Sequence, residues 1–499
     1  MPTFALLVFP ILPLILFAAL GPAKGLIWSV MLGYLFLPEN FGFDLPGLPP
    51  YDKNSAITFG LILPALLYWG RAERMPSADA MIRPAIYLCL ALLAVRAVGT
   101  ALTNPETLFD GPVVREGLTR RDAFSLMFES LLWFAPFLLA WRFLRRPEDH
   151  RHVLVALVVM GIVYTLLVLF ELRMSPQLNK WIYGYFPHNW RQHLRAGGYR
   201  PIVFLRHGLW IGFLLFSVIL AAMALSRDRP AERPLYLAAG VWAFLVLALS
   251  RNMGATLLAV AFAPTVLVLS ARAQVRVAAV TAILLLGYPI LSQTSVTPAT
   301  KLLEIVEPLS PDRAESFKFR LDNEALLSAR AYEKPLFGWG GYSRQRLIDE
   351  RGRDLTVTDG LWIIQLGQGG WVGYLGFFGV LTLPVLFLRR AARRKPIPPV
   401  IAGMAAIMAG NFLYMVPNST LNPIAFLILG SLAAFVQYDT ARDGEAPDPA
   451  AESVRDEQRY SRFSPGRREG ASVPAAAAAA RPARAARTAR PISRRAGRT

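Results

Sequence analysis

Residues 153–170 read VLVALVVMGIVYTLLVLF, a run without a single charged side chain. Crossing the hydrocarbon core of a bilayer takes about 20 such residues in a helix. The backbone of a lipid-embedded segment must satisfy its own hydrogen bonds, which leaves helices and closed β-barrels as solutions. This run lacks the two-residue alternation of barrel strands. It therefore predicts a transmembrane helix.

The composition extends this prediction to most of the chain. Of 499 residues, 54% are hydrophobic and 17% are charged, values typical of proteins that cross a membrane many times. We expect an all-α polytopic membrane protein with about 12–13 transmembrane helices. The expected helices are 4–20, 26–38, 56–69, 84–101, 123–140, 152–172, 209–225, 235–249, 255–269, 277–291, 361–388, 400–415 and 421–438.

The placement of charge predicts the orientation. The net charge is +19, and the basic residues gather in short loops such as 71–83, 142–151, 227–233, 272–276 and 389–395. Because Lys and Arg are retained on the cytoplasmic side, these loops are expected inside, and a nucleic-acid partner is not expected. The segments 103–121, 173–204, 250–254 and the long loop 292–360 then face outward.

The C-terminal tail differs from the rest of the chain. Residues 1–438 are expected to form the membrane domain, and residues 439–499 are acidic and then Ala/Arg-rich. Such low-complexity sequence offers few side chains for a core, so we expect a disordered cytoplasmic tail whose arginines suit anionic lipid.

Cofactors and metals are not expected. The chain contains no P-loop, dinucleotide-binding glycine pattern or His-Glu-x-x-His helix. His188 and His193, in PHNWRQH, have no acidic or cysteine neighbour in the sequence to complete a metal site, and Cys89 is the only cysteine.

The outward segments carry arginines that the usual charge bias would place inside. Arg200 and Arg206 lie among aromatic residues just before a helix that His207 begins, and Arg251 occupies the SRNMG turn. A guanidinium fork matches phosphate oxygens, so these arginines are candidate ligands of a phosphate or pyrophosphate group. Anchoring to lipid headgroups, or snorkelling of Arg251 to the interface, remains the alternative.

The long outward loop carries the remaining candidates. Ser310, Pro311 and Asp312 predict a helix start, and the helix should end near Tyr332, before Pro335. Arg320 and Glu324 share one face of that helix, as an ion pair or as part of a site. Asp359 and Trp362 stand at the start of the next helix, where a carboxylate can also be a simple cap. Glycines 369, 373, 376 and 379 predict close helix packing.

Three motifs together resemble the O-antigen ligase/polymerase family of bacterial membrane glycosyltransferases. They are ALSRNMGA at 248–255, FKFRLDNEALLSARAYEKPLFGWG at 317–340, and the TDGLW start of the glycine-rich helix. The resemblance covers residues 1–438. It implies transfer of glycan from an undecaprenyl-pyrophosphate-linked donor to an acceptor glycan, outside the inner membrane, without cofactor or metal.

The resemblance also implies roles for single residues. Arg251 and Arg320 match the family's arginines, and Arg200, Arg206 and Trp362 are further substrate-binding candidates. The ligase branch carries a histidine late in the long loop, whereas Asp359 stands at that position here and no histidine follows His207. Asp359, or else His207, is therefore the expected base.

This departure favours an exopolysaccharide or O-antigen polymerase over a ligase acting on lipid A-core, which stays an alternative. A flippase of the lipid-linked glycan, with Arg96 as its main mid-helix charge, is another. A role in assembly with other polysaccharide-synthesis proteins, through the tail, is the third.

Overall fold

The structure is a computed structural model that describes residues 1–499 except 45–48, 72–74, 196, 294–307, 309–310 and 439–499. Its helices are α1 (Pro2–Val8), α2 (Ile11–Phe36), α3 (Lys53–Tyr68), α4 (Ile82–Leu102), α5 (Arg120–Phe143), α6 (Pro147–Met174), α7 (Leu178–Tyr183), α8 (Gly208–Asp228), α9 (Arg233–Leu249), α10 (Met253–Val268), α11 (Ala271–Leu291), α13 (Pro311–Glu333), α14 (Leu361–Ala391), α15 (Pro399–Met415) and α16 (Pro423–Gln437). Three short antiparallel hairpins join β1 (Gly42–Phe43) to β2 (Tyr51–Asp52), β3 (Leu108–Asp110) to β4 (Val113–Arg115), and β5 (Leu194–Arg195) to β6 (Gly198–Tyr199).

The helices have the length and surface of membrane spans. In the described part of the chain, eight are long and apolar enough to cross a bilayer, and α10, α15 and α16 are shorter apolar helices. Many side chains on the surface of these helices, such as Leu102, Leu166 and Leu257, are large, apolar and exposed, as lipid contact requires. The chain is thus an all-α, multi-pass membrane protein.

The expected count of 12–13 separate spans exceeds the eight that length and composition identify. One reason lies at the N-terminus, where Pro2–Phe36 counts as a single candidate span. The two expected helices 4–20 and 26–38 belong to this stretch, which is kinked at Gly21 (φ 78°) ahead of Pro22. The other reason is that α3, α10, α15 and α16 are shorter than the length used for a full span.

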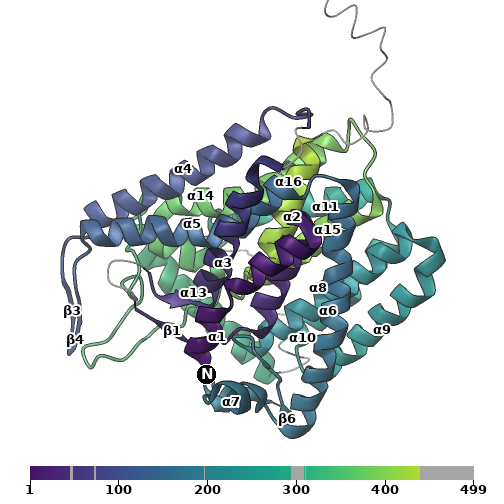
Figure 1. The fold of residues 1–499 in the computed structure, drawn as a ribbon. Helices are drawn as coiled ribbons and strands as arrows, with labels where there is room; N and C mark the ends of the chain where they lie inside the picture. The colour runs from purple at the N-terminus through teal and green to yellow at the C-terminus, as the bar shows by residue number, and fades with distance from the viewer. Residues whose placement is uncertain (45–48, 72–74, 196, 294–307, 309–310, 439–499) are drawn as a thin grey trace, which may run out of the picture. The chain divides into compact units, whose positions relative to one another are not determined.

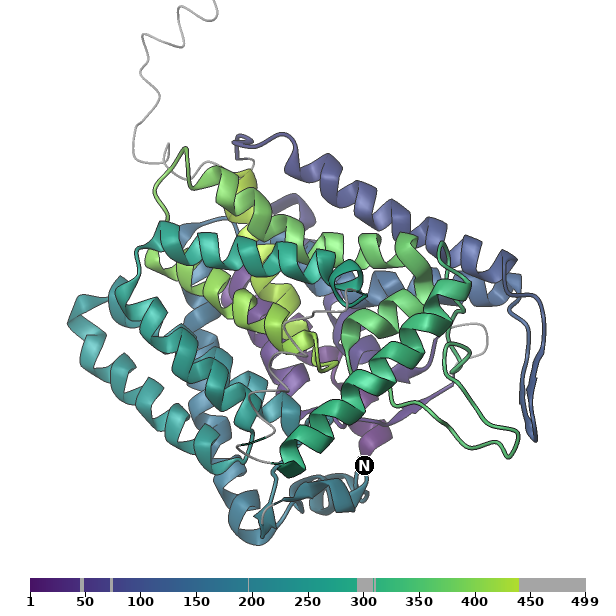
Figure 2. The ribbon, with the colours of Figure 1, turned by 180° about the vertical axis from the view of Figure 1, so that it is seen from behind.

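The helices pack pairwise into one bundle (Figure 1). Helix α14 packs along α4 and α11, α16 along α5, and α8 is surrounded by α6, α9, α10 and α15. Helix α8 is consequently the most buried of the eight long candidate spans, with side chains from Ile211 to Ser226 in the core. Helix α13 crosses the face seen in Figure 2 and packs on α14.

The glycine ridge of α14 packs as predicted. A Cβ at Gly369 or Gly373 would come within 3 Å of the Arg96 side chain of α4, and one at Gly379 would clash with Cys89. At Gly370 (φ 57°) the helix is broken. The PLFGWG segment lies against the break, where Trp371 and Val372 donate backbone hydrogen bonds to the carbonyl oxygens of Pro335 and Leu336.

The long loop predicted to face outward is partly helical. Helix α13 begins at Pro311 and ends at Glu333, which confirms the helix predicted from the proline positions. Residues 294–307 and the tail 439–499 lie outside the described residues, so the prediction of a disordered tail stays a prediction.

Candidate functional site

A cavity of about 1300 Å³ collects the predicted outward residues. It is lined by the segment before α8, the turn between α9 and α10, α13, the segment before α14, and the segment after α15. Six of the seven predicted site residues line it: Arg200, Arg206, His207, Arg251, Arg320 and Asp359. The sequence placed these residues on separate outward segments, and the structure brings the segments together.

The segment before α8 is fixed by a buried carboxylate. Glu171, at the end of α6, is fully buried and accepts hydrogen bonds from the backbone N–H groups of Ile202 (2.9 Å) and Val203 (2.7 Å). The Lys53 ammonium donates to the Phe204 carbonyl oxygen at 3.0 Å. These bonds hold the backbone that carries Arg200 and Arg206 at the cavity wall.

The turn between α9 and α10 holds Arg251 in an unusual backbone conformation. Arg251 has φ 59°, in the left-handed region that a branched-chain or long side chain seldom adopts. The next residue anchors it: the buried Asn252 side chain donates to the Gly208 carbonyl oxygen (3.1 Å) and accepts from the Tyr414 hydroxyl (3.1 Å). Strain held by such a network is common where a side chain must be aimed at a ligand.

Arg320 and Asp359 form an ion pair in the cavity wall. The Arg320 Nε lies 3.5 Å from an Asp359 carboxylate oxygen, and both side chains are about two-fifths exposed to the cavity. Burial raises the pKa of Asp359, and the neighbouring Arg320 opposes that rise. The pair therefore offers a cation for a substrate anion and a carboxylate of increased basicity beside it.

Glu324 and Trp362 lie behind this pair. The Tyr288 hydroxyl donates to the Glu324 carboxylate at 3.2 Å, and burial raises the pKa of Glu324 to about 7. Trp362 is fully buried, with its ring edge-on to Tyr288 at 5.0 Å between centroids. Trp362 is therefore placed in the packing beneath the site, not in the cavity as predicted for a substrate-binding residue.

His207 caps helix α8. Its Nδ1 accepts a hydrogen bond from the Leu209 N–H at 3.2 Å, so the neutral ring carries its proton on Nε2. In that tautomer Nε2 is a hydrogen-bond donor. This geometry suits an anion-binding residue better than the general base that the sequence also allowed.

A histidine cluster was missed at the sequence level. His188, His193 and His207 bring ligand nitrogens within 4.8 Å of one another, a set able to hold a metal ion. Two features favour an anion here instead. The Nδ1 atoms of His188 and His207 both accept backbone N–H groups, and Arg200 and Arg206 line the same cavity. Burial and Arg206 also lower the pKa of His188, which keeps that ring neutral.

An apolar cavity of about 400 Å³ adjoins the arginine-lined one. Its walls come from α11, α13, α14 and α15, with Leu284, Leu327 and Ile363 among them. Phe319, Arg320 and Asp359 line both cavities. The polar, cationic cavity thus continues into an apolar cavity between the helices.

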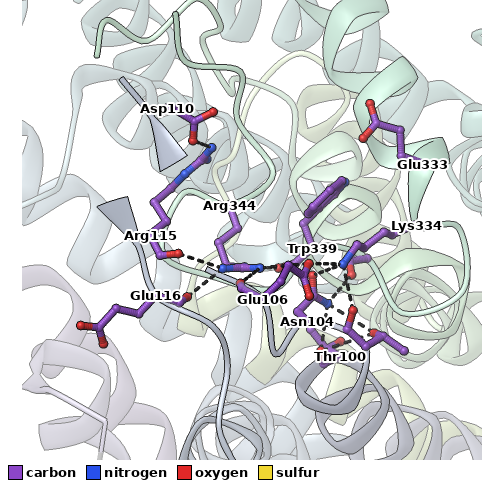
Figure 3. A network of polar contacts seen from close by, with 12 residues as sticks. Thr100, Asn104, Glu106, Asp110, Arg115, Glu116, Glu333, Lys334, Trp339 and Arg344 are labelled. Carbon is purple, nitrogen blue, oxygen red and sulfur yellow. Dashed lines mark hydrogen bonds and ion pairs between the residues drawn. The ribbon is translucent and has the colours of Figure 1, made fainter. Parts of the chain in front are cut away.

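A separate polar network connects the 103–119 loop with the 334–346 segment (Figure 3). Lys334 and Arg344 converge on Glu106, at 2.5 Å and 3.3 Å. Arg344 also donates to the Glu116 carbonyl oxygen (2.7 Å), and Arg115 pairs with Asp110. These cations have structural partners and join the 103–119 loop to the 334–346 segment.

Three groups around the site escaped prediction: Glu129, Glu171 and Asn252. The two glutamates lie inside apolar runs. A carboxylate at such a position is a sequence signal of function. Asn252 carries no comparable signal, because its partners Gly208 and Tyr414 are distant in sequence.

No protein-family model matches the chain, and a search of curated proteins gives no match. The fold and the cavity therefore define its class by themselves: a multi-pass, all-α membrane protein with an arginine-lined chamber.

Proposed function

We propose that the chain is a glycosyltransferase that moves glycan from an undecaprenyl-pyrophosphate-linked donor onto an acceptor glycan, as a polymerase of exopolysaccharide or O-antigen. The observation that carries this proposal is the convergence of Arg200, Arg206, Arg251 and Arg320 on one cavity that also holds Asp359. Four guanidinium groups match the charge and oxygen geometry of a pyrophosphate.

The chemistry needs only groups present in this cavity. The acceptor hydroxyl oxygen attacks the anomeric carbon of the donor sugar, and the bond from that carbon to the phosphate oxygen breaks. The electron pair leaves with the lipid pyrophosphate, whose charge the arginines stabilise. The hydroxyl proton passes to the Asp359 carboxylate, acting as general base. Displacement from the opposite face inverts the anomeric centre.

The adjoining apolar cavity supports a lipid-linked donor. A polyprenyl chain attached to the pyrophosphate needs an apolar path leading away from the arginines, and the walls around Leu284 and Ile363 supply one. In the proposed orientation the protein spans a bacterial inner membrane and the cavity opens to the periplasm. Helices α3, α10, α15 and α16 add four crossings to the eight long spans, which gives twelve, or thirteen where the kinked Pro2–Phe36 stretch crosses twice. The tail is cytoplasmic.

Reconstitution tests this function. The purified full chain in proteoliposomes would be given a lipid-pyrophosphate-linked repeat unit, with EDTA present throughout, and products would be sized by gel electrophoresis. We expect longer lipid-linked chains. Transfer only to added lipid A-core would instead assign the ligase reaction. Loss of the donor to the opposite leaflet without a new glycosidic bond would assign a flippase, and an unchanged donor would overturn the proposal.

A further inference from the structure

A second polar cavity, of about 740 Å³, shares a wall with the arginine-lined one. Its charged lining is nearly balanced: Lys53, Arg96 and Arg206 face Glu39, Asp44, Asp52 and Glu129. Aromatic side chains (Trp133, Trp210 and Tyr342) and amides (Gln365 and Gln368) also line it. Aromatic faces with amide and carboxylate groups are what a neutral or weakly charged sugar binds, whereas a diphosphate needs net positive charge.

We propose that this second cavity is the acceptor-glycan site, and that Tyr342 and Glu129 are sugar-binding residues within it. The inference rests on the proposed function, which requires two substrates to meet. The arginine-lined cavity holds the donor pyrophosphate, and the balanced, aromatic cavity holds the sugar that receives the glycan.

Tyr342 is presented to this cavity by a strained backbone. Tyr342 and Ser343 both have positive φ, 56° and 60°. The conformation is held in place because Arg115 donates to the Ser343 carbonyl oxygen (2.7 Å) and Arg344 is fixed by the network of Figure 3. Tyr342 is 70% exposed and lines this cavity, and its hydroxyl donates to the Asp122 carboxylate at 3.2 Å. An aromatic ring displayed at such a cost in backbone energy fits a stacking platform for a sugar.

Glu129 marks the place where the two substrates meet. Among the described residues, it is the one carboxylate that lines both polar cavities. It lies in the first half of the candidate span α5, and its side chain is open to the cavity. Arg206, Trp210 and Gln368 line the same shared wall. Arg96 lines the same cavity and interacts electrostatically with Glu129, which lowers the cost of a carboxylate at this depth. In the proposed site Glu129 also accepts a hydrogen bond from an acceptor hydroxyl.

Two binding titrations on the full chain in detergent test the proposal. The acceptor probe is the free oligosaccharide released by mild acid from the lipid-linked glycan of the producing cells, and the donor-headgroup probe is inorganic pyrophosphate. We expect Tyr342→Ala to weaken oligosaccharide binding about tenfold and to leave pyrophosphate binding unchanged. Glu129→Gln should weaken oligosaccharide binding by a similar factor without weakening pyrophosphate binding, because it removes a negative charge from the wall shared with the donor cavity. Arg251→Ala should show the reverse pattern. Tyr342→Phe keeps the ring and should bind oligosaccharide nearly as the wild type does.

Phe109→Ala is the matched control, because Phe109 is an exposed aromatic residue on β3 outside both cavities. Oligosaccharide binding that is unchanged in both Tyr342→Ala and Glu129→Gln would overturn the acceptor site, even where Arg251 controls pyrophosphate binding. An unchanged affinity for pyrophosphate in Arg251→Ala would instead count against the donor site. The two failures are thus read separately.

Discussion

Asp359 and Glu324 are carboxylates close to one another in the fold whose surroundings differ. Asp359 faces the guanidinium of Arg320, whereas Glu324 accepts a hydrogen bond from the neutral Tyr288 hydroxyl. Burial raises the pKa of both groups, and the cation opposes the rise at Asp359 alone. The ionised form is therefore favoured at Asp359, which suits a base, while Glu324 reaches a pKa of about 7.

The acid limb of the pH–rate profile should report on Asp359. A general base works only when ionised, so the rate should fall as the pH drops through the raised pKa. Arg320→Gln removes the opposing cation, so the pKa of Asp359 should rise further and the acid limb should move to higher pH. Asp359→Asn should lower the rate by about 10²- to 10⁴-fold above the pKa of Asp359 and should remove the acid limb. An acid limb that stays in place in Arg320→Gln would contradict this assignment.

Glu324 should make the fold less stable as the pH rises. Below the ordinary pKa of a glutamate both folded and unfolded forms are protonated, and stability is unaffected. Between that value and about 7 only the unfolded form ionises, so stability falls with rising pH, by up to about 3 kcal/mol in total. Glu324→Gln lacks this penalty. Thermal unfolding in detergent should show it more stable than the wild type at pH 8 and equal at pH 4; equal stability at pH 8 would count against the burial of this carboxylate.

Single site residues could be predicted from the sequence where a charged side chain lies in or beside an apolar run. Arg251 and Arg320 were visible as cations on outward segments, and both line the cavity. Trp362 was not correctly placed, because a tryptophan at a helix start reads the same whether its ring faces a cavity or the core. Glu324 looked like a partner of Arg320, and only the fold shows Arg320 turned towards Asp359.

Glycine allows helix α14 to break within its length, at Gly370. Its break at Gly370 lets Gln368 face both polar cavities, and the PLFGWG segment takes up backbone groups that the break frees. A broken span is tolerated in a membrane where protein covers its backbone. The PLFGWG motif thus supplies hydrogen-bond partners for backbone groups at the break.

Gly370→Ala should be strongly destabilising. A Cβ at Gly370 would lie 2.4 Å from the Leu336 carbonyl group, and φ is 57°. Left-handed strain and the clash together should cost about 2–4 kcal/mol, measured as a lower thermal midpoint in detergent. Gly287→Ala is the control, since α11 leaves open space there and alanine favours helix by up to about 1 kcal/mol. Equal effects of the two substitutions would refute the role given to Gly370.

Elements were the most predictable level of the structure. Apolar runs and proline positions predicted α13 and most spans to within a few residues. The predicted break between helices 4–20 and 26–38 is present as a kink at Gly21, but the chain continues as a helix directly after it instead of forming a loop to residue 26.

The molecule as a whole builds its chamber from segments far apart in sequence. Positive-inside reasoning placed these segments on one side but not against each other, because helix packing decides which loops become neighbours. All residues that line the three cavities belong to the unit Met1–Ala441.

Removal of residues 442–499 should therefore leave catalysis intact. We expect the truncated chain to elongate a lipid-linked glycan at the wild-type rate in proteoliposomes, where other assembly proteins are absent. A truncated chain that inserts normally and has lost elongation would place part of the active machinery in the tail.

The most direct test of the donor site compares elongation rates of Arg251→Ala, Arg320→Ala and Arg353→Ala in the same proteoliposomes. Arg353 is the control, an arginine whose side chain is 69% exposed and paired with Asp349 away from the cavity lining. We predict that each cavity variant loses about a hundredfold or more in rate while Arg353→Ala keeps the wild-type rate. Wild-type rates in Arg251→Ala and Arg320→Ala would contradict the assignment of the arginine-lined cavity to the pyrophosphate donor.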